Sequence, residues 1–419
     1  MDGGSGAVAR RRAEQLDAQD VLAPLRDRFV LPSGDETDLI YLDGNSLGML
    51  PRASIGRLHD LVAQEWGGGL VRSWPSWIDL PMQVGDRLGT ALLGAAPGQV
   101  VVADSTSVNL FKLGWAAADA RPGRSRIVTD AANFPTDRYV LEGIAHARGL
   151  TLDLIDDVDA AASAIDDQTA LVSLSHVDYR SAAIADVAGL TAAVHDAGAL
   201  VLWDLAHSAG AVPIELDAWH VDLAVGCTYK YLNAGPGAPA FLYVRAELQD
   251  QLRQPIWGWF GQRDQFTMGA GYDPLPGVER FQVGTPSIPG TVLVDEGVAL
   301  LAEAGIDRIR AKSVALTSLL VDLVDAWLMP LGFTVASPRD PARRGSHVSI
   351  AHPDGYRICR ALIEQGHVVP DFRAPDRIRC GLSPLTTRFV DVWDAMDRLS
   401  ALVEAGAHLV YGTERGAVT

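Results

Sequence analysis

A lysine set among aromatic and small residues is the first candidate for chemistry in this chain. Lys230 stands between Tyr229 and Tyr231 in GCTYKYLNAGPGAPAFLYV, just before an Asn-Ala-Gly-Pro-Gly turn and an apolar run. Lysine normally keeps its ammonium group in water, because burying an unpaired charge costs several kcal/mol. This position therefore indicates that the amine has a chemical role and is not a solvated surface charge.

Asp204 and His207 add a carboxylate and an imidazole after the preceding strand-like run, ALVLW. An acid and then a lysine at the ends of neighbouring strands is the pair that pyridoxal phosphate requires. The lysine amine condenses with the cofactor aldehyde to form a Schiff base, and the carboxylate keeps the pyridinium nitrogen protonated, so that the ring can accept electrons. Taken singly, Lys230 could be a surface lysine, and Asp204 with His207 could be a strand-end turn and helix cap.

The same cofactor needs donors for its phosphate, an aromatic group over its ring and, for an amino-acid substrate, a cation for the carboxylate. Thr106 and Ser107 open a predicted helix, and a helix N-terminus suits a phosphate. Phe134 in NFPTD can cover the ring, and Arg379 on a short predicted strand can bind a carboxylate bidentately. Two further candidates are Asp137 and, for the phosphate, Tyr229.

The elements that must position these residues follow a regular rhythm. From about residue 98 to 244, short β-branched runs alternate with alanine-rich helical stretches, which predicts a largely parallel sheet with helices on both faces. Ligands of such sheets collect at the carboxyl ends of the strands. The unusual segments DSTSVN, NFPTD, WDLAHSAG and TYKYLNAG all stand there. After about residue 295, two helical patterns, short strands and a final helix predict a smaller α+β domain.

The chain of 419 residues is therefore predicted to have an α/β fold with three parts: 1–65, an N-terminal arm and helix contributing to the small domain; 66–295, the large cofactor-binding domain; and 296–419, the small domain. A net charge of −17 argues against nucleic acid as a partner. The most apolar stretch, 314–333, carries Asp322 and Asp325 at helical spacing and is predicted to pack, not to span a membrane. Three cysteines without CxxC spacing favour a reducing cytoplasm and no zinc site.

With these segments in hand, the sequence resembles the kynureninase family, in the aminotransferase class V branch of fold-type I pyridoxal phosphate enzymes. The resemblance runs from about residue 41 to 398. The tract YKYLNAG, followed by GWFG and a distal Arg-x-x-x-Ser-Pro-Leu, is much more specific than the Asp–Lys pair. The matching segments are LDGNSLG, STSVNL, NFPTDRYV, WDLAHSAGAVP, TYKYLNAGPG, GWFGQ, PGVERFQVGTPSI and IRCGLSPLTTRFVDVWDA.

The resemblance implies roles for individual residues. Lys230 matches the Schiff-base lysine, Asp204 the pyridinium partner, and Tyr229 a phosphate-contacting tyrosine also implicated in proton transfer. Trp259 and Thr285 match positions delivered from a second subunit, which implies a homodimer with composite active sites. The remaining matches are Thr106 and Ser107 for the phosphate, Phe134 for stacking, Asp137, Ser175 and His207 for cofactor contacts, and Arg379, Asn45, Gly284, Thr285 and Trp74 for the substrate.

The reaction implied by the resemblance is hydrolytic Cβ–Cγ cleavage of L-kynurenine to anthranilate and L-alanine. Gly284-Thr285 stand where members that favour 3-hydroxykynurenine have Ser-Asn, which resembles the bacterial type and implies unsubstituted kynurenine. Gln262 stands where histidine is expected, so a substituted kynurenine remains open. Trp74 and Trp77 can line the same pocket or belong to a core or interface.

Two other enzymes and one non-enzyme are the alternatives. A cysteine desulfurase or selenocysteine lyase would need a nucleophilic thiol on a loop of the C-terminal domain, and SPRDPARRGSHVSIAHPDG has none. A class V aminotransferase would share Lys230 and Asp204 but not the kynureninase-like segments. A non-catalytic cofactor-binding module would not need Lys230, Asp204 and Arg379 together.

Overall fold

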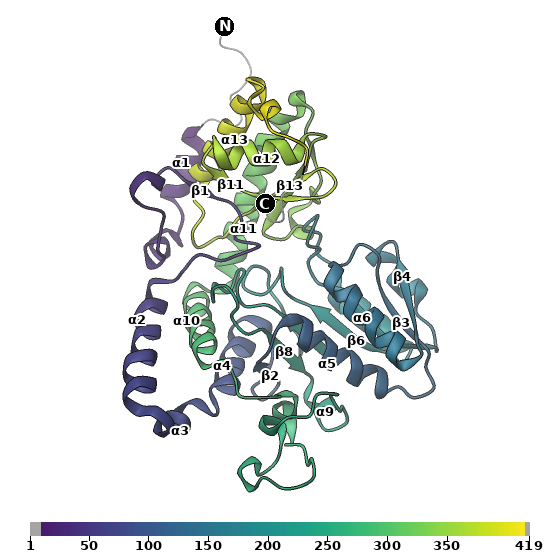
Figure 1. The fold of residues 1–419 in the computed structure, drawn as a ribbon. Coiled ribbons are helices and arrows are strands. Elements are labelled where there is room, and N and C mark those ends of the chain that lie inside the picture. Colours follow the sequence, from purple (N-terminus) through teal and green to yellow (C-terminus); the bar gives the residue numbers. More distant parts are fainter. Residues whose placement is uncertain (1–9, 415–419) are drawn as a thin grey trace.

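The computed structural model describes residues 10–414, in a large unit built on one sheet and a small unit beside it (Figure 1). The sheet has seven strands in the order β2-β8-β7-β6-β5-β3-β4, and only β8 runs antiparallel to its neighbours. This confirms the predicted α/β class. The strands are β2 Val100–Val102, β3 Arg126–Asp130, β4 Thr151–Ile155, β5 Thr169–Ser175, β6 Leu200–Asp204, β7 Leu223–Gly226 and β8 Phe241–Val244.

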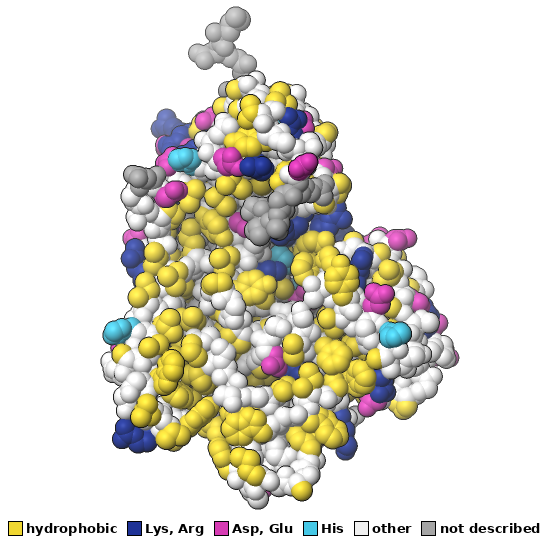
Figure 2. Space-filling model, in the orientation of Figure 1, with side chains coloured by type: hydrophobic (Ala, Val, Ile, Leu, Met, Phe, Trp, Pro, Cys, Tyr) yellow, Lys and Arg dark blue, Asp and Glu magenta, His cyan; other side chains and the backbone are white. Residues whose placement is uncertain are grey.

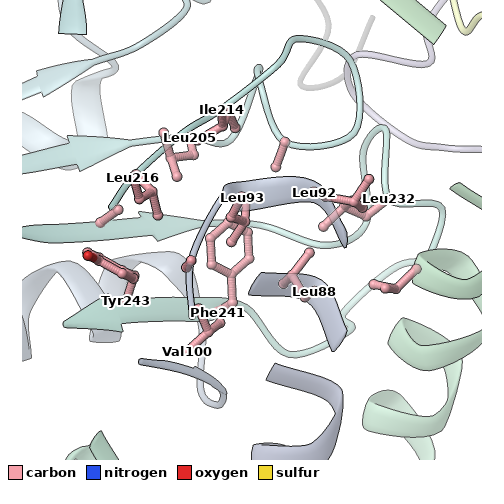
Figure 3. Packing of buried hydrophobic residues seen from close by; sticks show 14 of the residues in the cluster. Leu88, Leu92, Leu93, Val100, Leu205, Ile214, Leu216, Leu232, Phe241 and Tyr243 are labelled. Carbon is pink, nitrogen blue, oxygen red and sulfur yellow. The ribbon is translucent and has the colours of Figure 1, made fainter. Parts of the chain in front are cut away.

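Helices cover both faces of this sheet, because its central strands are buried along their whole length. The helices α5 and α6 share one apolar cluster with one face, and α4, α8 and α10 share another with the opposite face. Figure 3 shows Leu88, Leu92 and Leu93 packed over Phe241 and Val100. The helices of this unit are α4 Leu80–Leu88, α5 Thr106–Asp119, α6 Pro135–Arg148, α7 Ala161–Ala164, α8 Val187–Asp196, α9 Ala246–Gln249 and α10 Ile288–Ala304.

The small unit has its own apolar cluster around a four-stranded antiparallel sheet, β12-β13-β10-β9. The N-terminal arm joins this unit, since β1 (Ile40–Tyr41) pairs in parallel with β11 (Val368–Val369) and α1 (Arg10–Ala18) lies against α13 (Figure 1). The other elements are β9 Thr334–Val335, β10 His347–Ala351, β12 Asp371–Arg373, β13 Arg377–Gly381, α11 Ile306–Leu323, α12 Gly355–Glu364 and α13 Phe389–Glu404.

Both predicted boundaries fall inside helices. Residue 65 lies within a continuous helical run from α2 (Arg52–Asp60) through a π-helical segment, Leu61–Gly69, and the short α3 (Trp74–Trp77) follows. Residue 295 lies within α10, which packs against α2 and α4 of the large unit. The chain turns at Gly305, in a left-handed conformation with φ of +78°, and α11 then enters the small unit. Apolar periodicity did not reveal this break because α10 and α11 are both rich in buried aliphatic residues.

One helical run, Ile306–Leu331, is long and apolar enough to cross a membrane by length and composition alone. Its apolar residues Leu316, Leu319, Leu320 and Leu323 are buried in the core of the small unit. The helix therefore packs as the aspartates at helical spacing predicted.

Candidate active site

Lys230 lies in the turn that follows β7, where the large unit meets the small one. Its Nζ is 2.9 Å from Nε2 of His207. The N-terminal arm covers the turn, because the Gly48 amide donates to the Tyr229 carbonyl at 2.8 Å. A Cβ on Gly48 would lie 2.2 Å from the Lys230 carbonyl oxygen, so only glycine allows this approach. The structure thus places the lysine and the imidazole in contact.

Asp204 at the end of β6 forms a buried carboxyl pair with Asp137 at the start of α6. Burial, the charge of Asp204 and a hydrogen bond to it raise the pKa of Asp137 well above its ordinary value. Burial also raises the pKa of Asp204, although the Lys230 charge, the Ala206 amide (2.7 Å) and the hydrogen bond from Asp137 offset part of this. Asp137 therefore holds the proton of the pair and Asp204 is its charged member.

The predicted phosphate-binding turn opens α5, which begins at Thr106 as expected. Ser105 caps the helix by accepting from the Val108 amide, so the hydroxyls of Thr106 and Ser107 remain partly exposed in the first turn. Behind the turn, the buried Lys112 Nζ donates to Asp104 at 2.6 Å and to the Phe281 carbonyl at 2.7 Å. Lys112 was missed by the sequence analysis, and its helical position facing a strand end is the only signal for it.

Phe134 and Ser175 lie beside this carboxyl pair. The Phe134 ring is exposed and meets the Tyr179 ring edge-on at 5.2 Å. Ser175 at the end of β5 donates to the Asn133 side chain at 2.7 Å, and Asn133 Oδ1 also accepts from the Phe134 amide. Asn133 therefore links two predicted cofactor contacts, and it was not among the predicted residues.

The hydroxyl of Tyr229 stays protonated at physiological pH. Burial and the neighbouring Cys227 raise its pKa well above the ordinary value for tyrosine. Because a phenol with a raised pKa keeps its proton, Tyr229 can donate a hydrogen bond or a proton and does not act as a base.

Arg379 enters the site from β13, but its bidentate face is already occupied. Its Nε donates to Asp371 Oδ1 at 2.7 Å, and its Nη2 donates to Asp371 Oδ2. Nη1 donates to the Tyr179 carbonyl and Nη2 also to Ser46 Oγ at 3.2 Å. Asp371 thus occupies the bidentate face that was expected to bind a substrate carboxylate. Among the described residues, one Nη1 N–H of Arg379 has no acceptor.

A second group of predicted site residues lies around Phe260, apart from Lys230: Trp74, Trp259, Gly284 and Thr285. Trp259 and Trp74 both contact the Phe260 ring, at centroid distances of 4.7 and 6.3 Å. The Phe260 amide donates to the Val283 carbonyl at 3.2 Å, which places the exposed Gly284 and Thr285 beside this aromatic group. In Figure 1 these segments lie at the bottom, on the side of the large unit away from the small one. Gln262 is held by its own segment, accepting from the Asp273 amide at 2.8 Å and donating to the Arg263 carbonyl.

Several buried polar atoms of the site have no hydrogen-bond partner among the described residues. They include Nδ1 of His207, both ring nitrogens of His347, and both amide atoms of Asn45. The His207 and His347 rings are 5.5 Å apart. Since buried polar groups are normally satisfied, this group indicates a polar ligand or ordered water between the units. Together with Lys230, the Asp204 carboxylate and the helix terminus, the donor set fits pyridoxal phosphate.

The chain is 47% identical to a kynureninase from Pseudomonas fluorescens over 397 residues, which is 93% of this chain and 94% of that one. The chain belongs to the kynureninase family. It is also 45% identical to a kynureninase from Burkholderia pseudomallei, covering 95% and 96% of the two chains. The family profile described as the kynureninase C-terminal domain matches residues 309–399.

Solved structures share the fold at low sequence identity. A cysteine desulfurase from Thermococcus onnurineus NA1 superposes with a TM-score of 0.79 at 20% identity, covering 91% of this chain and 98% of that one. The cysteine desulfurase CsdA from Escherichia coli gives 0.76 at 17% identity, covering 92% and 98%. These likenesses show the fold alone. They confirm the predicted fold-type I architecture within the kynureninase family.

The three cysteines separate this kynureninase-family member from a desulfurase. Cys227, Cys359 and Cys380 are all free and buried, and burial raises the pKa of each thiol. A nucleophilic thiolate needs exposure and a lowered pKa. None of the three meets either condition.

Asp371 and Arg373, which surround Arg379 in the small unit, were not among the predicted site residues, although the sequence carries a signal for them. Asp371 and Arg373 alternate on β12, and they pair directly with Arg379 and Arg377 on β13. The segment DFRAPDRIR is therefore typical of a β-hairpin with charged side chains on one face and a Pro-Asp turn. Its period of two puts Asp371 opposite Arg379.

Proposed function

We propose that this protein hydrolyses L-kynurenine to anthranilate and L-alanine, using pyridoxal 5′-phosphate. The observation that carries the proposal is the near full-length similarity to kynureninases, with Lys230 and Asp204 both present at strand ends of the site. When bound, pyridoxal phosphate supplies an aldehyde for attachment and a ring that withdraws electrons from the substrate.

Lys230 and His207 form the proton-handling pair on the reacting side. With the cofactor bound, the free Lys230 amine would take the α-proton of the substrate at Nζ. His207 lies 2.9 Å from that nitrogen, and burial followed by the Lys230 charge lowers the pKa of its imidazole well below the ordinary value. A neutral His207 accepts a hydrogen bond from Nζ and orients it without competing for charge.

Asp204 and Tyr229 act at opposite ends of the reaction. With pyridoxal phosphate bound, the Asp204 carboxylate would pair with the ring nitrogen and favour its protonated form, while Asp137 would hold Asp204 through a hydrogen bond. When water adds to the γ-carbonyl and the Cβ–Cγ bond breaks, the Tyr229 hydroxyl, protonated because of its burial, would donate a proton to Cβ.

The substrate is held by its carboxylate and its aryl ring. One Nη1 N–H of Arg379 and the unpaired Asn45 amide are the donors for the carboxylate. For the ring, we infer that Gly284 and Thr285 favour unsubstituted kynurenine. Gln262 is not assigned to the ring, because both polar atoms of its side chain make hydrogen bonds within its own segment.

We further propose that the protein is a cytoplasmic homodimer in which Trp259 and Thr285 complete the site of the partner. Figure 2 shows hydrophobic side chains gathered over the left and lower parts of this face, where Figure 1 draws α2 and the residue 257–272 projection. Exposed apolar side chains of this size are typical of an interface. They include Ile55, Val62, Trp66, Leu70, Val71, Trp257, Phe266 and Met268.

The activity is tested by recording the visible absorbance of the purified protein and then following anthranilate fluorescence after L-kynurenine is added. We expect a visible band of bound cofactor and anthranilate release, both altered in Lys230→Ala. A band without anthranilate from kynurenine, or from its ring-substituted forms, would favour an aminotransferase. No band after incubation with pyridoxal phosphate contradicts the proposal.

The composite site is tested by mixing two inactive variants, Lys230→Ala and Trp259→Ala. If each site needs Trp259 from the other subunit, reassembled mixtures recover about a quarter of the wild-type activity, because half of the dimers are mixed and each has one intact site. No recovery, with dimers verified by light scattering, contradicts sharing of Trp259.

A further inference from the structure

Two carboxylates and two guanidinium groups form one largely buried cluster where the N-terminal arm meets the small unit, and the Arg373 side chain is 34% exposed. Asp371 is 1% exposed and pairs with Arg379 through two hydrogen bonds. Arg373 adds a third contact, with its Nη2 2.8 Å from Asp371 Oδ2, and Ser46 Oγ donates to the same oxygen at 2.9 Å. The Asp371 carboxylate thus has four contacts and stays ionised.

Asp43 is the second carboxylate, and its side-chain partners are weaker: a hydrogen bond with Ser46 and the more distant charges of Arg379 and Arg373. It lies on the loop after β1, bridged in parallel to Gly381, the residue that ends β13. Its Oδ1 is buried with no hydrogen-bond partner among the described residues. The titratable and charged groups that act on it, or on which it acts, are Tyr41, Tyr231, Cys359, Asp371, Arg373, Arg379 and Cys380.

The charges of this cluster balance only without a ligand. Burial raises the pKa of the two tyrosines and the two cysteines, so these four remain neutral. Asp43 and Asp371 then offset Arg373 and Arg379. A substrate carboxylate bound to the free Nη1 N–H of Arg379 adds a third negative charge, and no further cation of the cluster is there to offset it.

We propose that Asp43 takes up a proton when the substrate carboxylate binds beside Arg379, which makes it a positioning residue that couples substrate binding to pH. The proposal rests on the proposed function, because it needs a carboxylate substrate at Arg379. Asp371 cannot play this role, since its hydrogen bonds from Arg379 and the arginine charges outweigh its burial.

The direction of the pH effect follows from the cluster. Without substrate, burial and the Asp371 charge raise the pKa of Asp43 to about 7. The hydrogen bond with Ser46 and the charges of Arg379 and Arg373 oppose this rise. A third carboxylate raises the pKa further. Between the two values the complex binds more protons than the free protein, so affinity weakens as pH rises above about 7, by up to about tenfold per unit.

The test uses the holoenzyme and desaminokynurenine, the substrate lacking its α-amino group, so that the ligand amine does not titrate. Calorimetry at pH 8 in buffers of different ionisation enthalpy measures the protons taken up on binding. We expect uptake approaching one proton per site in the wild type and none in Asp43→Asn, whose affinity is also independent of pH. Asp38→Asn, an exposed aspartate of the same arm, should keep the wild-type uptake.

The carboxamide of the same probe is the second control and needs no variant. Since it carries no charge, it should bind the wild type without proton uptake, even if Asp43→Asn fails to fold. Uptake that persists in Asp43→Asn, or equal uptake for acid and carboxamide, overturns the inference. Binding of the acid without uptake overturns it too, while release of anthranilate from kynurenine leaves the proposed function standing. Failure both to bind the acid and to turn over kynurenine overturns the two together.

Discussion

Two pairs of aspartates flank the site, and the fold treats them in opposite ways. Asp137 and Asp204 come from the large unit, where Lys230 is the one cation among the described residues that acts on them, so burial raises the pKa of both, and that of Asp137 the more strongly. Asp43 and Asp371 come from the arm and the small unit, where two arginines lower the pKa of Asp371 while that of Asp43 rises. The same residue type becomes a proton holder or a fixed charge according to the cations that surround it.

The strongest test of this contrast is Asp204→Asn. The variant removes the charge that faces the pyridinium nitrogen, so we expect kcat for kynurenine cleavage to fall by about 10²–10³-fold. Asp204→Glu keeps the charge and should lose less. Steady-state kinetics with cofactor saturation verified by absorbance measure both. Equal activity of Asp204→Asn and the wild type would contradict the assignment.

Asp371→Asn tests the fixed charge of the other pair. Removing one partner of a buried ion pair leaves Arg379 uncompensated, so the free energy of unfolding should fall by about 3–5 kcal/mol. Urea denaturation followed by circular dichroism measures this. Asp325→Asn removes an exposed partner of Arg339, and its effect should stay within about 1 kcal/mol. Similar losses in the two variants would show that burial of the pair is not decisive.

Asp137→Asn sharpens the asymmetry within the large-unit pair. The amide is neutral and donates an N–H to Asp204, as the protonated carboxyl does, so kcat should fall by about tenfold or less. Asp137→Leu removes the donor and should lose more. The ratio of kcat between the Asp137 and Asp204 amide variants is the measurement. If the Asp137 variant is the more damaged, the proton belongs to Asp204 and the assignment is reversed.

Asp43→Asn has an effect on stability that depends on pH. Because the folded pKa of Asp43 lies above its unfolded value, the folded state binds more protons and loses stability as pH rises from about 4 to 7. The asparagine variant has no such loss. Its stability relative to the wild type should therefore increase through this window, by up to about 4 kcal/mol between pH 4 and pH 8. Urea midpoints at pH 5 and pH 8 measure this, and a pH-independent difference would contradict it.

The positions of the large-unit residues could be predicted because the sequence pattern shows where each strand ends. Lys230, Asp204 and Thr106 each follow an apolar run, and parallel strands bring their carboxyl ends to one edge. Arg379 was predictable in place but not in geometry. The pairing of Asp371 with Arg379 could have been predicted from the hairpin pattern. Asp43 lies near them because the N-terminal arm bridges to Gly381, and no local sequence pattern indicates that contact.

The sequence by itself determined the parallel sheet and the family, and it placed Lys230 and Asp204 at the ends of neighbouring strands. It could do so because apolar periodicity, strand-end polarity and segment motifs are local or ordered along the chain. Only the tertiary structure decided that Asp371 occupies Arg379 and that burial beside Asp204 raises the pKa of Asp137. The charge of a carboxyl group depends on burial and on cations brought from distant segments, and these exist only once the chain has folded.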